Sequence, residues 1–258
     1  MFRGLERPPA WAIVAILAGL VAIGIMTPIA LRRGAVPADV IAAAQASESA
    51  AASSSAAARK STDAADAARI GIAVLGDSYT AGSPMDSGEQ SEWPALLTAA
   101  HPWDVTRYAV GGTGFVAGRD AGTDFAARVP DVVAAKPDVV IVEGGHDDSG
   151  SSPAEVAAAA STVLTDLRTG LPDAKIIVLG VLWPGSAPAK VFAIDGSLKA
   201  VTDDVGGVFV DALRQGWFDG ANGRLIGSDG TNPTDEGHAA LAQRIGDALI
   251  AAGVPASV

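Results

Sequence analysis

From Arg69 onward, short apolar runs alternate with helix-like stretches, and this alternation leaves the chain few folds to adopt. The apolar runs are rich in β-branched residues and too short for isolated helices, so we interpret them as buried strands. Regular β-α alternation predicts a parallel sheet covered by helices on both faces. The expected strands are 70–75, 105–110, 139–142, 175–182 and 208–211. The expected helices are 92–100, 124–134, 153–169, 189–204 and 235–252.

Two further regions precede this domain. Residues 11–31 are almost unbroken in apolar character and carry arginines on both flanks, and a membrane-spanning helix needs about 20 such residues. A cleaved signal peptide has a shorter apolar centre, so we favour an uncleaved anchor over residues 1–33. Residues 34–68 consist mostly of Ala and Ser and cannot bury enough surface to fold, which predicts a tether. The folded domain would then occupy residues 69–258.

Composition excludes several classes of function. The formal net charge of -11 and the sequence pI near 4.6 argue against nucleic acid as a partner, because phosphate binding needs a basic surface. The chain has no cysteine, which excludes disulfides, thiol catalysis and cysteine-ligated metals. No cluster of residues has a recognisable metal-ligand spacing, so we expect no metal.

Candidate chemistry gathers where the expected strands end, since ligand sites of open α/β sheets lie at the carboxyl ends of strands. Gly76-Asp77-Ser78 follows the first strand. Ser78 is either a nucleophile or simply the cap of a strand-to-helix turn. Glycines at 111–114 follow the second strand and allow backbone N–H groups to approach a ligand, although a plain tight turn explains them as well.

Two more polar motifs lie at the same predicted edge. Glu143-Gly144-Gly145-His146-Asp147-Asp148 follows the third strand and is either part of a site or a solvated loop. The stretch 228–238 precedes the last helix and places Asp229 and Asn232 three residues apart on a turn. Asp235, Glu236 and His238 begin the helix itself, where acidic groups favour the helix dipole.

In this order, the four motifs resemble those of the SGNH (GDSL-like) hydrolase superfamily over roughly residues 69–252. The resemblance implies a flavodoxin-like three-layer α/β/α sandwich with a five-stranded parallel sheet, no cofactor, and a serine esterase or lipase activity. It implies that Ser78 is the nucleophile and that Gly112 donates its N–H to the oxyanion hole. It also implies that Asp229 orients the general base.

Two positions depart from the family pattern. The third block, Gly-x-Asn-Asp, aligns with Gly145-His146-Asp147-Asp148, which puts Asp147 where an oxyanion-binding asparagine is expected. The shifted alignment, Gly144-Gly145-His146-Asp147, puts His146 there instead. The last block has Asn232 where the catalytic histidine is expected.

An amide cannot accept the serine proton at neutral pH, so the base must be sought elsewhere. The chain has three histidines. His146, at the catalytic edge, is one candidate for the base. We interpret His238 as structural, because Pro233 after Asn232 supports the alignment that excludes it. His101 is expected at the opposite end of the sheet.

Three functions follow as hypotheses. The first is a membrane-anchored serine hydrolase that cleaves acyl or acetyl esters of glycans, lipids or small molecules, with its domain outside the cytoplasm. The second is a pseudoenzyme of the same fold that binds a glycan or a protein. The third, a nucleotide- or phosphate-binding protein, rests only on the glycines at 111–114, with no phosphate-loop pattern.

Overall fold

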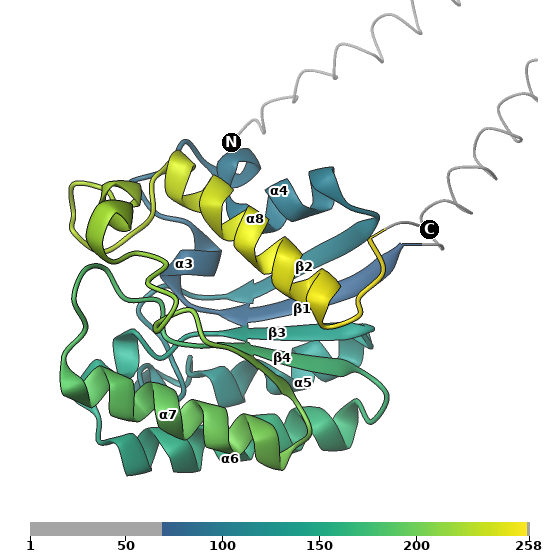
Figure 1. The fold of residues 1–258 in the computed structure, drawn as a ribbon. Helices are drawn as coiled ribbons and strands as arrows, with labels where there is room; N and C mark the ends of the chain where they lie inside the picture. The colour runs from purple at the N-terminus through teal and green to yellow at the C-terminus, as the bar shows by residue number, and fades with distance from the viewer. Residues whose placement is uncertain (1–68, 257–258) are drawn as a thin grey trace, which may run out of the picture. The chain divides into compact units, whose positions relative to one another are not determined.

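The computed structural model describes residues 69–256, which form three layers around one parallel sheet (Figure 1). Its strand order is β2-β1-β3-β4-β5, the order of flavodoxin-like folds. This confirms the expected three-layer α/β sandwich with five parallel strands. The strands are β1 (Ile70–Gly76), β2 (Trp103–Ala109), β3 (Val139–Glu143), β4 (Lys175–Leu179) and β5 (Val208–Val210). The helices are α3 (Ser78–Ala81), α4 (Trp93–Ala100), α5 (Phe125–Ala135), α6 (Pro153–Gly170), α7 (Ala189–Asp204) and α8 (Asp235–Ala251).

Each face of the sheet packs its own hydrophobic core. In β1, Ile72 and Val74 point into the core beneath α4 and α8, whereas Ala73 and Leu75 point into the core beneath α5, α6 and α7. Figure 1 shows these two helical layers on opposite sides of the strands. Because both faces are covered, β3 is buried along its whole length, which explains its unbroken apolar sequence.

Four short 3₁₀ turns complete the domain: η1 (Glu89–Ser91), η2 (Arg119–Ala121), η3 (Asp147–Gly150) and η4 (Gly220–Leu225). Side-chain caps begin several helices, as in α5, where Asp124 accepts from the N–H of Ala127, and in α6, where Ser152 accepts from that of Glu155. The expected helices begin within one residue of the observed ones, although α4 and α7 have no side-chain cap.

The strand limits differ more from the expectation. The apolar run 175–182 predicted a strand of that length, yet β4 ends at Leu179. Beyond it, the N–H of Gly180 donates to the carbonyl of Val210 at 2.7 Å, and the chain then leaves the sheet while its side chains stay buried. The residues that follow β4 are apolar because they are buried in a loop, and the apolar run in the sequence is therefore longer than the strand.

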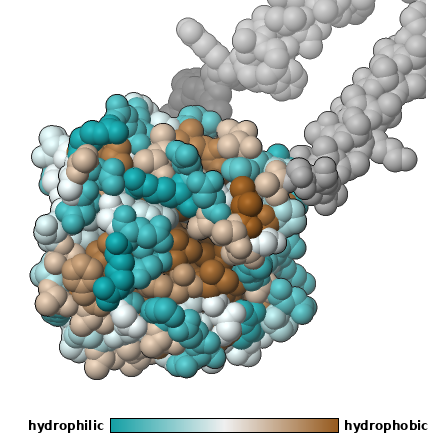
Figure 2. Space-filling view, in the orientation of Figure 1, coloured by the Kyte–Doolittle hydropathy of each residue, from teal (hydrophilic) through white to brown (hydrophobic). Residues whose placement is uncertain are grey.

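The predicted anchor over residues 1–33 and the tether over 34–68 lie outside the described residues. Within residues 69–256, no helix is long and apolar enough to cross a membrane. Figure 2 shows apolar side chains gathered between α7 and α8, at the open edge of the sheet. A hollow of about 560 Å³ lies along β5 and α8, and it contains none of the candidate site residues.

Candidate active site

Ser78 is the first residue of α3, directly after the central strand β1. It is not the cap of this helix, because the Asp77 side chain takes that role and accepts from the N–H of Tyr79 at 2.9 Å. Gly76, just before them, leaves no room for a side chain, since a Cβ there would lie 2.4 Å from Oγ1 of Thr80. The Gly-Asp-Ser sequence therefore builds a tight strand-to-helix turn that presents a half-buried serine.

The glycine loop after β2 lies against this serine. A Cβ on Gly111 would be 3.5 Å from the Cβ of Ser78, and Gly112 has a positive φ of 75° with open space beside it. Among the described residues, neither the N–H of Ser78 nor that of Gly112 donates a hydrogen bond. Two free backbone donors beside a serine are what an oxyanion site requires.

The third motif contributes residues from β3 and η3. His146 places its Nδ1 3.2 Å from the carbonyl oxygen of Leu182, and its ring lies 4.9 Å from that of Trp183 and 5.8 Å from that of Tyr79. A carbonyl accepts only, so Nδ1 is the donor, and in the neutral imidazole Nε2 then keeps its lone pair. The Leu182 carbonyl thus fixes the orientation of the His146 ring, which lies beside Tyr79, the residue that follows Ser78.

The two aspartates that follow have different surroundings. Asp148 is buried and accepts from three successive backbone N–H groups, those of Phe115, Val116 and Ala117, at 2.8–2.9 Å. It therefore ties the loop after β2 to the loop after β3. Asp147 has a buried Oδ2 with no hydrogen-bond partner. Burial raises the pKa of Asp147, with the neighbouring His146 opposing the shift.

The last motif forms a closed turn. Oδ1 of Asp229 accepts from the backbone N–H groups of Thr231 and Asn232, and its Oδ2 accepts from the Asn232 side chain at 2.6 Å. Although burial opposes the shift, these hydrogen bonds hold the pKa of Asp229 below its usual range. The amide oxygen of Asn232 is buried and has no partner. Asn232 thus occupies, beside Asp229, the place of an aspartate-oriented base.

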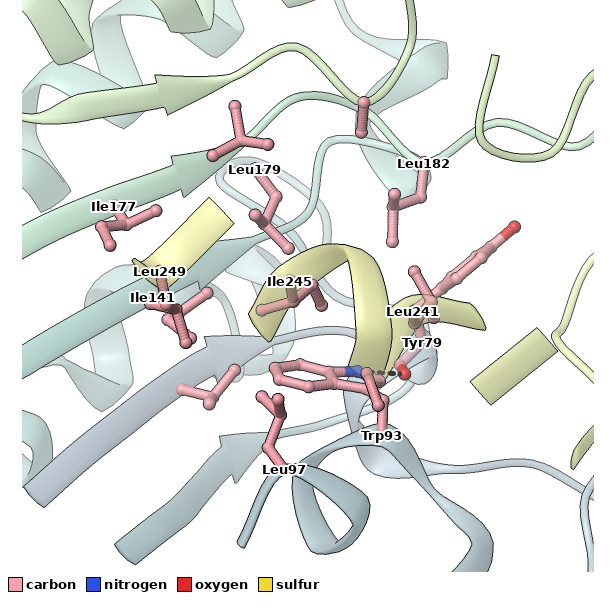
Figure 3. Packing of buried hydrophobic residues seen from close by; sticks show 14 of the residues in the cluster. Tyr79, Trp93, Leu97, Ile141, Ile177, Leu179, Leu182, Leu241, Ile245 and Leu249 are labelled. Carbon is pink, nitrogen blue, oxygen red and sulfur yellow. Dashed lines mark hydrogen bonds between the residues drawn. The ribbon is translucent and has the colours of Figure 1, made fainter. Parts of the chain in front are cut away.

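Tyr79 joins this turn to the nucleophile. Its hydroxyl donates to the carbonyl of Thr231 at 2.6 Å, so the residue after Ser78 is bonded to the residue before Asn232. The carbonyl of Tyr79 in turn accepts from Nε1 of Trp93 at 2.9 Å, within the core drawn in Figure 3. Ser78, Gly112 and the Asp229–Asn232 turn therefore gather at one edge of the sheet.

The other two histidines lie elsewhere. His238 is fully buried, accepts from the N–H of Trp93 at 3.3 Å and lies 3.5 Å from the carboxylate of Asp86. Burial lowers the pKa of His238 although Asp86 opposes this, which fits a structural role. His101 stacks on Trp103 at 4.0 Å, at the start of β2 and away from the site. No group of three or more potential metal ligands occurs in the part of the chain that the structure describes.

Sequence reasoning assigned no role to one conspicuous group beneath Ser78. The carboxyl groups of Asp77 and Glu143 are both fully buried, and that of Glu143 accepts from the backbone N–H of Asp77 at 3.3 Å. In the sequence, the only sign of this pair was Glu143, an acidic residue at the end of the otherwise apolar strand β3. Its partner cannot be deduced without the register of β1 against β3, in which Leu75 lies opposite Val142.

Comparison with known proteins agrees with this geometry. Residues 74–240 match the model of the GDSL-like Lipase/Acylhydrolase family. A GDSL lipase of Mycobacterium tuberculosis is 31% identical over 183 residues, covering 67% of this chain and 79% of the relative. The chain belongs to the GDSL-like lipase/acylhydrolase family. This confirms the resemblance seen in the four sequence motifs.

Solved structures share the fold of this GDSL-like domain. A carbohydrate acetylesterase from Sinorhizobium meliloti is 19% identical, with a TM-score of 0.57, and the match covers 71% of this chain and 100% of that one. A family two carbohydrate esterase from Clostridium thermocellum, in complex with cellohexaose, is 18% identical, with a TM-score of 0.60 and coverages of 72% and 65%. At such identities, these matches show a common fold for the GDSL-like domain.

Proposed function

We propose that this protein is a serine hydrolase that removes short acyl groups from carbohydrate or other small-molecule esters, with Ser78 as its nucleophile. The observation that carries the proposal is the pair of free N–H groups, of Ser78 and Gly112, beside a serine presented at the end of β1. In the attack of the Ser78 hydroxyl on an ester carbonyl, these N–H groups would bind the oxyanion. The GDSL-like family supports ester chemistry, and the likeness to carbohydrate esterases supports the substrate class.

The proton of Ser78 needs an acceptor, and we assign His146 to this role. The Leu182 carbonyl fixes the tautomer of the ring, as a carboxylate does in the usual triad, and leaves Nε2 able to accept. The protonated imidazole would then return its proton to the leaving alcohol. Asn232, held by Asp229, is an amide and contributes no proton transfer in this scheme.

Asp147 completes the proposed oxyanion site in an unusual way. An ionised carboxylate would repel the developing negative charge, whereas a protonated carboxyl group can donate a hydrogen bond to it. Its buried Oδ2 lacks a partner, and burial favours the protonated form. We therefore align Asp147 with the family asparagine and Asp148 with the family aspartate, whose three backbone contacts fix the loop.

Replacement of the nucleophile tests the proposal. We expect the native domain to hydrolyse p-nitrophenyl acetate and acetylated sugars, and Ser78→Ala to lose this activity by about 10⁴-fold or more, because the covalent step disappears. A fluorophosphonate probe should label the native serine and leave the variant unlabelled. Absence of both turnover and labelling in a folded native protein would reject the hydrolase and favour the binding protein suggested by Asn232.

The assigned base makes a second prediction. His146→Ala should lower kcat for the same ester by about 10²–10⁴-fold, since general-base catalysis contributes on that order. His101→Ala is the matched control, because this ring stacks on Trp103 far from Ser78 and should leave kcat unchanged. Equal kcat values for native protein and His146→Ala would show that another group accepts the serine proton.

We also propose, from residues 11–31 of the sequence, that the domain is tethered to the membrane and works outside the cytoplasm. Protease added to intact cells should then digest the domain. A domain that stays intact in whole cells but is cleaved after lysis would contradict this location.

A further inference from the structure

Beneath Ser78 lie two carboxyl groups whose burial is unusual for acids. Asp77 and Glu143 are both 0% exposed, and neither forms an ion pair with a cation among the described residues. Arg128, the cation whose charge reaches them, donates instead to the carbonyls of Gly76 and Tyr108 and to the hydroxyl of Thr113. Two adjacent buried carboxylates without a counter-ion repel each other, and sharing one proton relieves this repulsion.

The hydrogen-bond partners of the four carboxyl oxygens also indicate one proton shared between Asp77 and Glu143. Oδ1 of Asp77 accepts from the N–H of Tyr79, and Oε2 of Glu143 accepts from the N–H of Asp77 at 3.3 Å and from Oγ1 of Thr80 at 2.8 Å. The remaining oxygens, Oδ2 of Asp77 and Oε1 of Glu143, are buried without a partner. Buried polar atoms are rarely left unsatisfied. A proton held between the two carboxyl groups supplies the missing donor.

These contacts surround the nucleophile. The Glu143 carboxyl group accepts from the backbone N–H of Asp77, just before Ser78, and from the hydroxyl of Thr80, two residues after Ser78. Gly76 makes room for this carboxyl group, because a Cβ at position 76 would lie 3.0 Å from Oε2 of Glu143. Glu143 therefore braces both sides of the turn that presents Ser78.

We propose that Glu143 is a positioning residue that holds the Ser78 turn through one proton shared with Asp77, and that the site works only while this proton is bound. This proposal rests on the hydrolase function proposed above. When the proton leaves, two negative charges lie beneath Ser78. They repel each other and oppose the negative charge that develops on the attacked ester.

The electrostatics define the pH range. Burial raises the pKa of Glu143 to about 7, although hydrogen bonds from Thr80 and Asp77 oppose the shift. Burial, and then the charge of Glu143, raises the pKa of Asp77 well above its usual value. The titratable and charged groups around the pair are Asp147 after β3, whose ionised form raises both pKa values, and Arg128 on α5.

The folded-state pKa of Glu143 is higher than the unfolded-state value of 4.5. The folded protein therefore binds more protons than the unfolded chain between these values. The stabilisation that this proton contributes is complete below about pH 4.5 and is lost as the pH rises through about 7.

Glu143→Gln tests the proposal because the amide mimics the protonated acid. Its N–H can donate to Asp77 and its carbonyl can accept from Thr80. As the pH rises from 5 to 8.5, we expect the native protein to lose roughly 5 °C or more of Tm, and Glu143→Gln to lose clearly less. In ester hydrolysis, kcat of the native protein should fall above about pH 7, while kcat of Glu143→Gln should stay level, with KM unchanged in both.

Asp138→Asn is the matched control. This carboxylate also accepts from a backbone N–H, that of Gly71 at 2.8 Å, but it lies at the opposite end of the sheet. Asp138→Asn should keep the native pH dependence of both Tm and kcat. If Glu143→Gln does not fold, Asp77→Asn removes the same shared proton and keeps a helix cap, so it can replace that variant.

Two readouts are independent of turnover. The Tm comparison tests the shared proton, and amide hydrogen exchange over residues 77–81, corrected for the intrinsic pH effect, tests the bracing of the turn. We expect this exchange to accelerate above pH 7 in the native protein and not in Glu143→Gln. An unchanged pH dependence of Tm and exchange in Glu143→Gln would overturn the inference, whether or not the protein hydrolyses esters. Absent turnover with the expected Tm and exchange results would reject only the hydrolase function.

Discussion

Ester hydrolysis lost with His146→Ala should return when Asn232 is replaced by histidine in the same chain. We expect the double variant to exceed His146→Ala by about 10²–10⁴-fold in kcat, the usual contribution of a general base. Asp229 already accepts from the Asn232 side chain at 2.6 Å, so an imidazole at 232 would find its orienting carboxylate in place. Assays of p-nitrophenyl acetate with native protein, both single variants and the double variant measure this rescue.

Asn232→Gln is the control for that experiment. It keeps an amide and adds only a methylene group, so it should not rescue His146→Ala. If histidine at 232 also fails to rescue, while fluorophosphonate still labels Ser78, the turn that holds Asp229 does not direct residue 232 toward the serine.

The largest expected effect on stability comes from Trp93. Its side chain is fully buried between α8 and the sheet, and its Nε1 donates to the carbonyl of Tyr79 (Figure 3). Trp93→Ala should lower the free energy of unfolding by about 3–5 kcal/mol, because truncation of a buried tryptophan leaves a cavity. At roughly 2–4 °C per kcal/mol for a domain of this size, calorimetry should show a Tm lower by about 10 °C.

Trp93→Phe separates packing from hydrogen bonding. It keeps most of the apolar contacts and removes only the donor to Tyr79, so its cost should be about 1–3 kcal/mol. A Trp93→Phe variant as unstable as Trp93→Ala would show that the hydrogen bond, and not the filled core, accounts for the effect of this residue.

The sequence predicted the elements well where local signals are strong. The helix α6 (Pro153–Gly170) was predicted to begin at its observed first residue, because serines precede it and Pro153 stands in its first turn. Ser78 was identifiable because a glycine-marked turn follows a β-branched run. Limits were predicted less well where apolar residues continue into buried loops, as they do after β4.

Contacts between distant residues had no local signal. The bond from Tyr79 to Thr231 joins residues 152 positions apart, and the pairing of Asp77 with Glu143 depends on the register of β1 and β3. Conversely, the two aspartates after β3 looked alike in the sequence. Asp148 is buried and accepts hydrogen bonds from the loop after β2, whereas Oδ2 of Asp147 is buried without a hydrogen-bond partner. Only the fold distinguishes such neighbours.

The bond between Tyr79 and Thr231 also orders events during synthesis of the protein. Ser78 is translated before Thr231, Asn232 and α8. A second hydrogen bond, from Nε1 of Trp103 to the carbonyl of Pro255 at 2.7 Å, likewise joins an earlier part of the chain to a much later one. A nascent chain thus carries its serine before it carries the turn at residues 229–232, so the full site assembles only once that turn has emerged.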